Sequence, residues 1–533
     1  MTQWEIAIFA AYLLLTVAVG FMVARKGRST SRDYFMGDRE LPWYVVGASM
    51  VATAISSDNF IAQVGAGYTH GIVISAFSWN AWIVYTLLIW IFLPYYMRTG
   101  LYTMPEFLER RYHPAARYIF AVSCVVGYLF SLIAAPLYAG GLALESMFGM
   151  DLVWAIVFLG VLTGAYTVYG GLKSAAWTDF MQIAVLLAGG ILVPVIGLWK
   201  VGGLAQLMQE HPEKFQVFHG PKHNLFPFTG VFTSFLSVGI WYNCTSQHIV
   251  QRCLGARNEY NARMGVVTAG FLQILMPVLF VLPGIIAFKL FPNLQRPDQA
   301  YILLVESLVP QGLRGLILAA IAAALMSHLS ALTNSTSTIL TMDLYRKLVR
   351  PDASEHALVR FGQWSGTAVM GLGIAIALWF STSQSSLFVL IQEGFAYIAP
   401  PFAVIFTLGL LWWRANTPGA FATIALGFLF TLFLQFYLFR SVVWLAPYAN
   451  YLHRAVISWA FCMIVMITVS LSTRPPDLEK IGGMIWNWRY SALPAAEQAR
   501  YSGWRDLRLW WLIFIGTVLA IYGFFLWFRL EHP

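Results

Sequence analysis

Length, composition and charge assign this chain to one class of protein before any motif is considered. It has 533 residues, of which 59% are hydrophobic and 11% charged, and its mean hydropathy is +0.67. A soluble chain of this length would form three or four domains of roughly 150 residues each. This composition excludes a soluble protein and predicts a polytopic membrane protein that spans a lipid bilayer.

Apolar segments recur along the whole chain, each with the roughly 20 residues that a membrane-spanning helix needs. We therefore expect an all-α fold with about 14 transmembrane helices. In chain order the predicted spans are 4–24, 43–72, 75–96, 118–144, 152–169, 175–198, 228–250, 262–288, 316–345, 359–380, 387–413, 420–439, 455–471 and 509–528. The four cysteines fall within or beside these segments and form no CxxC pair, so neither a disulfide framework nor a metal site is indicated.

The positive charges are distributed unevenly between the two sides of the predicted bundle. The net charge is +9, and the loops 25–39, 98–117 and 474–508 carry much of it. Loops on the cytoplasmic side of a membrane are enriched in Lys and Arg. We therefore predict that these loops lie inside and that both termini lie outside, in a plasma membrane or bacterial inner membrane. The charge needs no nucleic-acid partner to explain it.

The apolar segment 47–68 is interrupted at its middle by Ser56, Ser57, Asp58 and Asn59. Irregular backbone at membrane depth is tolerated only where it is buried in protein or lines a watery cavity. Ionisable residues in such segments usually mark functional sites. The interruption therefore predicts a broken helix that carries a binding site.

A second interruption, residues 241–247, lies in span 228–250, five spans after the first. Interrupted helices at corresponding positions of two halves indicate a secondary transporter with inverted repeats and a site at the membrane midplane. We predict a 5+5 repeat with one extra helix before it and three after it. The expected units are an N-terminal helix and basic loop (1–42), the first repeat (43–200), an outside loop (201–227), the second repeat (228–415) and three C-terminal helices (416–533).

Several motifs strengthen this interpretation. They are YTVYGGLKSAAWTDFMQ at 166–182, GASMVATAISS at 47–57, YTMPEFLERRY at 102–112, NSTSTILTMDLY at 334–345, LPGIIAF at 282–288 and LIQEGFAYIAPP at 390–401. Together they resemble the sodium/solute symporter family, and are most similar to its sodium/glucose cotransporter branch. The resemblance implies a leucine-transporter type of fold and coupled uptake of a solute by alternating access.

The resemblance also implies an ion site between the first broken helix and the helix around residue 327. Backbone carbonyls of Ala52, Ile55 and Ala324 and the hydroxyl of Ser327 would hold sodium, and His328 stands where the family has a second serine. A hard cation prefers oxygen ligands, so the imidazole removes one ligand. Asp179 matches an acid on the inner exit path of the ion, and Ser330 faces that path one turn from Ser327.

For the solute, the resemblance points to five positions. Gln392 and Tyr242 match a sugar-binding glutamine and an inner-gate tyrosine, Asn59 replaces a glutamine, Ser78 replaces a glutamate, and Gln273 replaces a lysine. These side chains predict a polar, uncharged pocket and a small neutral solute such as a sugar or polyol. No organic cofactor is expected, and the oligomeric state is not predicted.

Other functions stay open on the sequence alone. Histidine can change its charge near physiological pH, so His328 makes a proton-coupled symporter the first alternative, followed by uncoupled transport. A solute sensor or a channel on the same fold is the rival class. No kinase, dehydrogenase or nucleotide-binding motif supports an enzyme.

Overall fold

The computed structural model describes residues 2–24, 30–221, 225–380, 387–442, 449–481 and 483–532; within its helices, the side chains of residues 146, 147, 387–394, 440 and 480 lie outside this description. The described residues form helices, with one isolated bridge between Leu41 and Ala256. The predicted all-α architecture is confirmed.

The first part of the chain comprises α1 (Gln3–Ala24), α2 (Ser31–Met36), η1 (Gly37–Arg39), α3 (Trp43–Ala54), η2 (Asn59–Gln63), α4 (Val64–His70), η3 (Gly71–Ser75), α5 (Ala76–Trp79), α6 (Ala81–Leu87), η4 (Leu88–Phe92), α7 (Leu93–Arg98), α8 (Met104–Arg111), α9 (Pro114–Gly127), η5 (Tyr128–Ala134), α10 (Ala135–Phe148) and α11 (Leu152–Lys200). The middle part comprises α12 (Leu204–Glu210), η6 (Pro212–Phe215), α13 (Phe228–Thr233), η7 (Ser234–Leu236), α14 (Val238–Ile240), η8 (Trp241–Thr245), α15 (Gln247–Leu254), α16 (Glu259–Phe280), α17 (Leu282–Leu290), η9 (Pro297–Gln299), α18 (Ala300–Leu308), α19 (Arg314–Thr338), η10 (Ile339–Val349), α20 (Glu355–Phe380) and α21 (Leu387–Leu411). The last part comprises α22 (Thr417–Phe433), η11 (Leu434–Leu438), α23 (Phe439–Ser441), α24 (Tyr451–Ser472), α25 (Leu478–Ile481), η13 (Trp488–Tyr490), α26 (Ala495–Arg500), η14 (Gly503–Arg505) and α27 (Leu507–Glu531).

Ten helical stretches among the described residues are long and apolar enough to cross a membrane. One of them, α11, has 49 residues. As a straight helix it would be roughly 73 Å long, more than twice the thickness of a bilayer's hydrocarbon core. It breaks at Gly171, where φ is +63° and a Cβ would lie 2.4 Å from the carbonyl oxygen of Tyr34. This break falls between the predicted spans 152–169 and 175–198. The total of 14 spans and the unit boundaries remain predictions.

Both predicted helix interruptions are present. Helix α3 ends at Ala54, and the chain is non-helical at Ile55 and Ser56 before η2 and α4 continue. In the second, η8 ends at Thr245, and α15 starts after an extended Ser246 with φ −76° and ψ 130°. Each break leaves backbone groups inside the bundle without helical partners.

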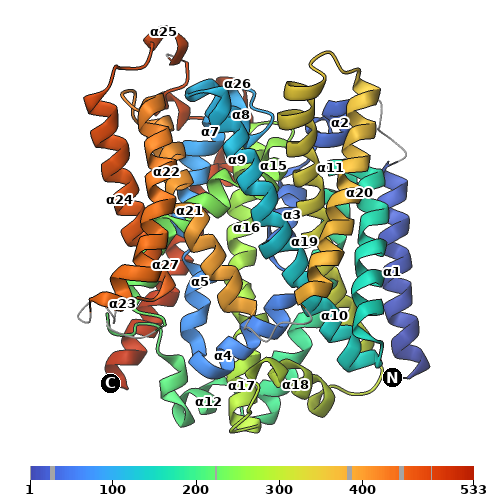
Figure 1. Cartoon of the computed structure of the whole chain (residues 1–533). Coiled ribbons are helices and arrows are strands. Elements are labelled where there is room, and N and C mark those ends of the chain that lie inside the picture. Colours follow the sequence, from blue (N-terminus) through green and yellow to red (C-terminus); the bar gives the residue numbers. More distant parts are fainter. Residues whose placement is uncertain are drawn as a thin grey trace.

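Helix α19 lies in the middle of the bundle, and both termini lie at one end of the molecule, the lower end of the view (Figure 1). In the most apolar stretch of α19 and η10, 94% of residues are buried. The short helices α2, α8 and α26 lie at the opposite end (Figure 1). Termini at one end are consistent with an even number of membrane crossings.

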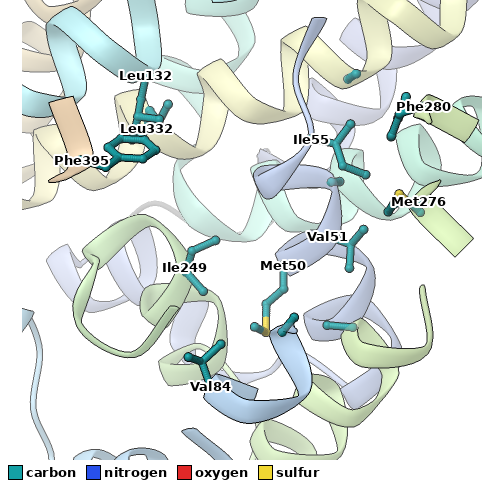
Figure 2. Close-up of a cluster of buried hydrophobic side chains, with 14 of the residues drawn as sticks. Met50, Val51, Ile55, Val84, Leu132, Ile249, Met276, Phe280, Leu332 and Phe395 are labelled. Atoms are coloured by element: carbon teal, nitrogen blue, oxygen red, sulfur yellow. The ribbon is translucent and has the colours of Figure 1, made fainter. Parts of the chain in front are cut away.

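The hydrophobic core surrounds the first break. Figure 2 shows Met50 and Val51 of α3 and Ile55 of the break beside Met276 and Phe280 of α16. All five side chains are almost completely buried. This packing holds the end of α3 in place, and the polar groups of the break are positioned by a rigid apolar frame.

Candidate transport site

The first break supplies acceptors for an ion. The last carbonyls of a helix have no intrahelical donor, and α3 ends within the protein core. The hydroxyl of Ser327 donates to the carbonyl oxygens of Ala52 (2.8 Å) and Ala324 (3.0 Å). Ser327 is fully buried. The structure therefore brings together three of the five predicted ion-site residues. Ile55 starts the break in an extended conformation (φ −106°, ψ 132°), directly after the helix that carries Ala52.

His328 follows Ser327 on α19 and bridges two different elements. Its Nδ1 is 2.5 Å from the carbonyl oxygen of Thr53, and its Nε2 is 2.9 Å from that of Leu132 in η5. The ring is 3% exposed. The imidazole therefore links the end of α3 to η5, where the serine of the family pattern would provide a hydroxyl.

Asp179, which the sequence analysis placed on the exit path of the ion, is enclosed by other helices in this conformation. It is completely buried on α11, accepts a hydrogen bond of 2.6 Å from Ser49 of α3, and lies 3.4 Å from Nη2 of Arg252 on α15. Ser330 is likewise fully buried on α19. Arg252 was not identified in the sequence analysis, because the predicted span 228–250 ends two residues before it, and its burial is visible only in the structure. Asp179 therefore connects α11 to both α3 and α15.

A cavity of about 220 Å³ lies beside the first break. Four of the five predicted solute-binding residues line it: Asn59, Ser78, Tyr242 and Gln273. The fifth, Gln392, lies in α21, but its side chain is outside the described part of the chain. His328 also reaches the cavity wall. Small-molecule sites typically have volumes of about 300–1,000 Å³, so this cavity suits a small solute.

The predicted solute-binding residues differ in whether their side-chain polar atoms already have hydrogen-bond partners within the protein. The side-chain oxygen of Asn59 accepts from the backbone nitrogen of Ser56 (2.8 Å), and its amide group donates to Gln63 (2.7 Å). Asn59 therefore caps the helix after the break, as in a capping box. Gln273 differs, because its Oε1 is buried without a hydrogen-bond partner in the described structure. A buried amide oxygen of this kind is suited to a solute hydroxyl.

Aromatic rings form much of the remaining wall. The ring centroid of Tyr242 lies 5.8 Å from that of Phe395 and 5.0 Å from that of His248. Phe77, Tyr85, Phe235 and Tyr451 also line the cavity. Aromatic faces provide apolar area with a defined geometry.

The expected uncharged pocket is wrong in one respect, because Asp58 lines the cavity. The Ser56 hydroxyl donates to Asp58 Oδ1, and the Asp58 side chain stays partly exposed to the cavity. The sequence analysis placed Asp58 in the first break but did not include it among the solute-binding residues. The sequence feature that could have identified it is an acidic residue within an interrupted apolar segment.

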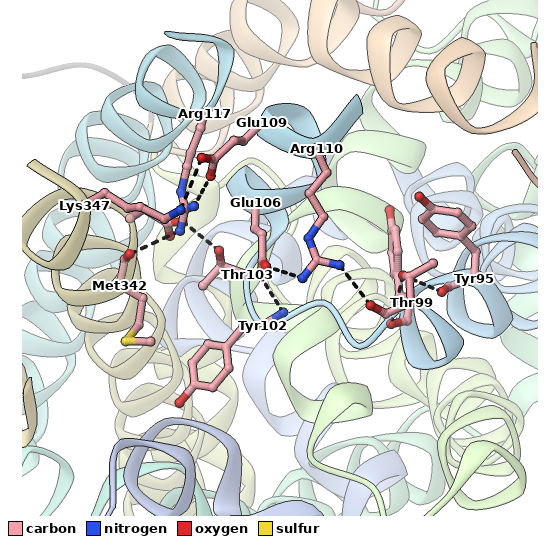
Figure 3. Close-up of polar contacts among 12 residues, drawn as sticks. Tyr95, Thr99, Tyr102, Thr103, Glu106, Glu109, Arg110, Arg117, Met342 and Lys347 are labelled. Atoms are coloured by element: carbon pink, nitrogen blue, oxygen red, sulfur yellow. Dashed lines mark hydrogen bonds and ion pairs between the residues drawn. The ribbon is translucent and has the colours of Figure 1, made fainter. Parts of the chain in front are cut away.

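Charged contacts join α8, α9 and η10 near the end of the molecule opposite the termini, and we call this set of contacts the closure (Figure 3). Arg117 of α9 pairs with Asp343 of η10 (2.5 Å) and with Glu109 of α8, and Lys347 is 3.2 Å from Glu109. Thr103 donates to Asp343 (2.7 Å). Asp343 and the Arg117 guanidinium are almost completely buried. Cavity-lining residues such as Tyr451 and Leu452 start α24, whose first turn lies toward the end with the termini (Figure 1). The cavity therefore lies toward the end with the termini.

Two interrupted helices around a central cavity, with freed carbonyls beside it, define a secondary transporter. The model of the "Sodium:solute symporter family" matches residues 34–427. The chain is 32% identical to a sodium/glucose cotransporter of Vibrio parahaemolyticus, covering 89% of this chain and 91% of the relative. It is 33% identical to the sodium/myo-inositol cotransporter 2 of Homo sapiens, covering 93% and 80%.

Two solved structures show the same leucine-transporter type of fold. One is a Na⁺-coupled sialic acid symporter, with a TM-score of 0.78 and 23% identity, covering 89% of this chain and 99% of that chain. The other is a nucleobase-cation-symport-1 family transporter, with a TM-score of 0.56 and 16% identity, covering 85% and 97%. The chain belongs to the sodium:solute symporter family. It is a multi-pass membrane transporter that couples solute movement to sodium, and it is not an enzyme.

Proposed function

We propose that this protein takes up a small hydroxylated solute, a sugar or polyol, together with sodium by alternating access. The observation that carries the proposal is the cavity in which Ser78, Tyr242 and Gln273 surround the break next to Ser327. Amide and hydroxyl groups both donate and accept hydrogen bonds, as sugar hydroxyls do. Two relatives named above carry glucose and myo-inositol in their names, and both compounds are polyhydroxylated.

We assign sodium to the carbonyls of Ala52, Ile55 and Ala324 and to the hydroxyl of Ser327. The Ser327 hydroxyl lies within hydrogen-bond distance of two of these carbonyls, those of Ala52 and Ala324. When sodium is bound, this hydroxyl turns its lone pairs to the ion, and the carbonyls exchange a hydrogen-bond donor for a cation. We propose that Asp179 and Ser330 come to line the path by which the ion leaves to the inside, once Asp179 separates from Arg252.

The closure at one end supports the proposal of alternating access. In this conformation the cavity lies toward the end with the termini, which we place outside from the loop charges. Release to the inside requires separation of the contacts at the other end, including those of Arg117 with Asp343 and of Arg252 with Asp179.

The test is uptake into proteoliposomes of purified protein, with labelled sugars and polyols and an imposed inward sodium gradient. One sodium ion crossing about 100 mV supplies about 2.3 kcal/mol, and a tenfold gradient adds about 1.4 kcal/mol. The expected result is accumulation of the solute against its own gradient, up to several hundredfold. A channel or sensor would only equilibrate the solute, and this outcome would contradict symport.

Proton coupling through His328 is the alternative to sodium coupling, and the relatives named above support sodium. Both ring nitrogens face carbonyl oxygens, which accept but never donate. A neutral ring can donate to one of them, whereas a protonated ring donates to both. Replacing the sodium gradient by an acid-outside pH gradient in the same vesicles separates the candidates. Accumulation with the pH gradient alone would establish the proton as the coupling ion.

A further inference from the structure

The described lining of the solute cavity contains an acidic side chain without a Lys or Arg to match it. Among the described residues that line it, Asp58 is the acid, and neither Lys nor Arg is present. Arg454, which lies between lining residues on α24, places its guanidinium 5.2 Å over the ring of Tyr397 and does not line the cavity. The His328 ring is held between two carbonyl oxygens. No basic side chain of the described wall is therefore available to balance Asp58.

This imbalance matters when the solute is enclosed. Closing the cavity over a neutral solute would remove water from an acid whose described partners, the Ser56 hydroxyl and the backbone N–H groups of Asp58 and Asn59, are all uncharged. Transfer of a carboxylate from water to an apolar environment is costly unless a charge or strong donors compensate it. A cation on the solute would provide that compensation during every transport cycle.

The walls around the cavity fit the same cation. Phe77, Tyr85, Phe235, Tyr242 and Phe395 all line it. An organic ammonium group is attracted to the faces of such rings, and aromatic cages with an acid are a common way to bind it. Ser78 and Gln273 remain available for hydroxyl groups on the rest of the solute. The cavity thus offers hydroxyl partners together with an ammonium site.

We propose that the solute of this transporter is an aminated sugar or polyol, and that Asp58 pairs with its ammonium group. The proposal rests on the proposed function and narrows its substrate class. It assigns Asp58 the role of a specificity-determining residue, with Ser56 orienting the carboxylate.

The experiment uses full-length protein in proteoliposomes and records sodium-dependent transport currents on a solid-supported membrane. The probes are three matched compounds, D-glucosamine, D-glucose and N-acetyl-D-glucosamine, and a second pair, 1-amino-1-deoxysorbitol and sorbitol. N-acetylation keeps the nitrogen but removes its positive charge. Each is tested on wild type, Asp58→Asn, Asp58→Glu and the control Glu306→Gln, which neutralises an exposed acid on α18.

Wild type should show an apparent KM lower by about 10- to 100-fold for the aminated member of each set, the range expected for a hydrogen bond between charged groups. Asp58→Asn should remove this preference, Asp58→Glu should retain part of it, and Glu306→Gln should not change it. Asparagine still accepts the Ser56 hydrogen bond, so Asp58→Asn should keep the fold; an unchanged melting temperature checks this.

Two results would overturn the proposal. If the neutral compounds are transported as well as or better than the aminated ones, the ammonium assignment is wrong while sugar or polyol symport stands. If no compound of either set produces a sodium-dependent current, the proposed function itself fails. Because wild type alone distinguishes charged from neutral probes, the test does not depend on the folding of any variant.

Discussion

The hydroxyl of Ser327 lies 2.8 Å from the carbonyl oxygen of Ala52, although the two residues are 275 positions apart in the chain. This contact joins the helix that breaks first to α19, a helix that is buried along nearly its whole length. A proposed sodium ligand set is therefore assembled from two separate elements. Any movement of α3 relative to α19 changes its geometry, which is how ion binding and conformation can be coupled.

Ser327→Ala should raise the sodium concentration needed for half-maximal uptake by about tenfold or more, since it removes one ligand worth roughly 1.5 kcal/mol. Ser335→Ala is the matched control, because the Ser335 hydroxyl bonds within its own helix, to the carbonyl of Leu332. Uptake measured at several sodium concentrations gives the half-saturating sodium concentration of each variant. An unchanged sodium dependence in Ser327→Ala would place the ion elsewhere.

His328→Ser should lower the half-saturating sodium concentration, because it returns a hydroxyl ligand to the site. It also removes the ring that bridges Thr53 and Leu132. Uptake is measured with sodium gradients and with pH gradients for wild type and variant. A wild type driven only by an acid-outside gradient, with sodium dependence appearing in the variant, would establish the proton alternative.

Gln273→Met and Asn59→Ala should both weaken uptake, but in different ways. Gln273 has a free buried oxygen, so its loss should raise the apparent KM for the solute by about 5- to 30-fold at unchanged melting temperature. Asn59 caps the helix after the break, so Asn59→Ala should also reduce stability, by about 1 kcal/mol. Uptake kinetics and thermal unfolding are compared. Equal effects on stability would show that Gln273 is structural as well.

The predicted orientation can be tested with single cysteines. Glu306 on α18 and Glu479 on α25 are exposed at opposite ends of the molecule (Figure 1). The four native cysteines are buried, so background labelling should be low. With an impermeant thiol reagent on intact cells, Glu306→Cys should label and Glu479→Cys should label only after permeabilisation. The reverse pattern would mean that both termini lie inside.

The closure in Figure 3 should weaken in acid. Partial burial works to raise the pKa of Glu109, but the hydrogen bond and charge of Arg117, with help from Lys347, outweigh it and hold this pKa below its ordinary value. A lowered carboxyl pKa means that the stabilisation is present above the unfolded-state pKa and is lost as the pH falls through the folded-state pKa.

We therefore expect the melting temperature of wild type to fall more than that of Glu109→Gln as the pH drops below about 4.3, the ordinary pKa of glutamate. At neutral pH the variant should be the less stable of the two. Thermal unfolding across this pH range provides the measurement. Parallel curves for wild type and variant would show that Glu109 contributes nothing through its charge.

The sequence by itself determined the class of protein and the positions of both breaks. Hydropathy is a local and additive property, so apolar stretches of membrane length, and polar interruptions such as 56–59, are visible without any tertiary contact. Family motifs added Ser327, Ala52 and Ala324, which the structure brings together.

Only the tertiary structure decided which polar side chains face the cavity and which are held in hydrogen bonds or ion pairs within the protein. The sequence could not show that Asn59 caps a helix, that Asp58 faces the cavity, or that Arg252 meets Asp179. Nor could it show that Asp343 is buried against Arg117, 226 positions away. The position of a polar residue within a span is encoded locally, whereas its partner is set by how distant helices pack, and that packing determines whether the residue binds a ligand or supports the fold.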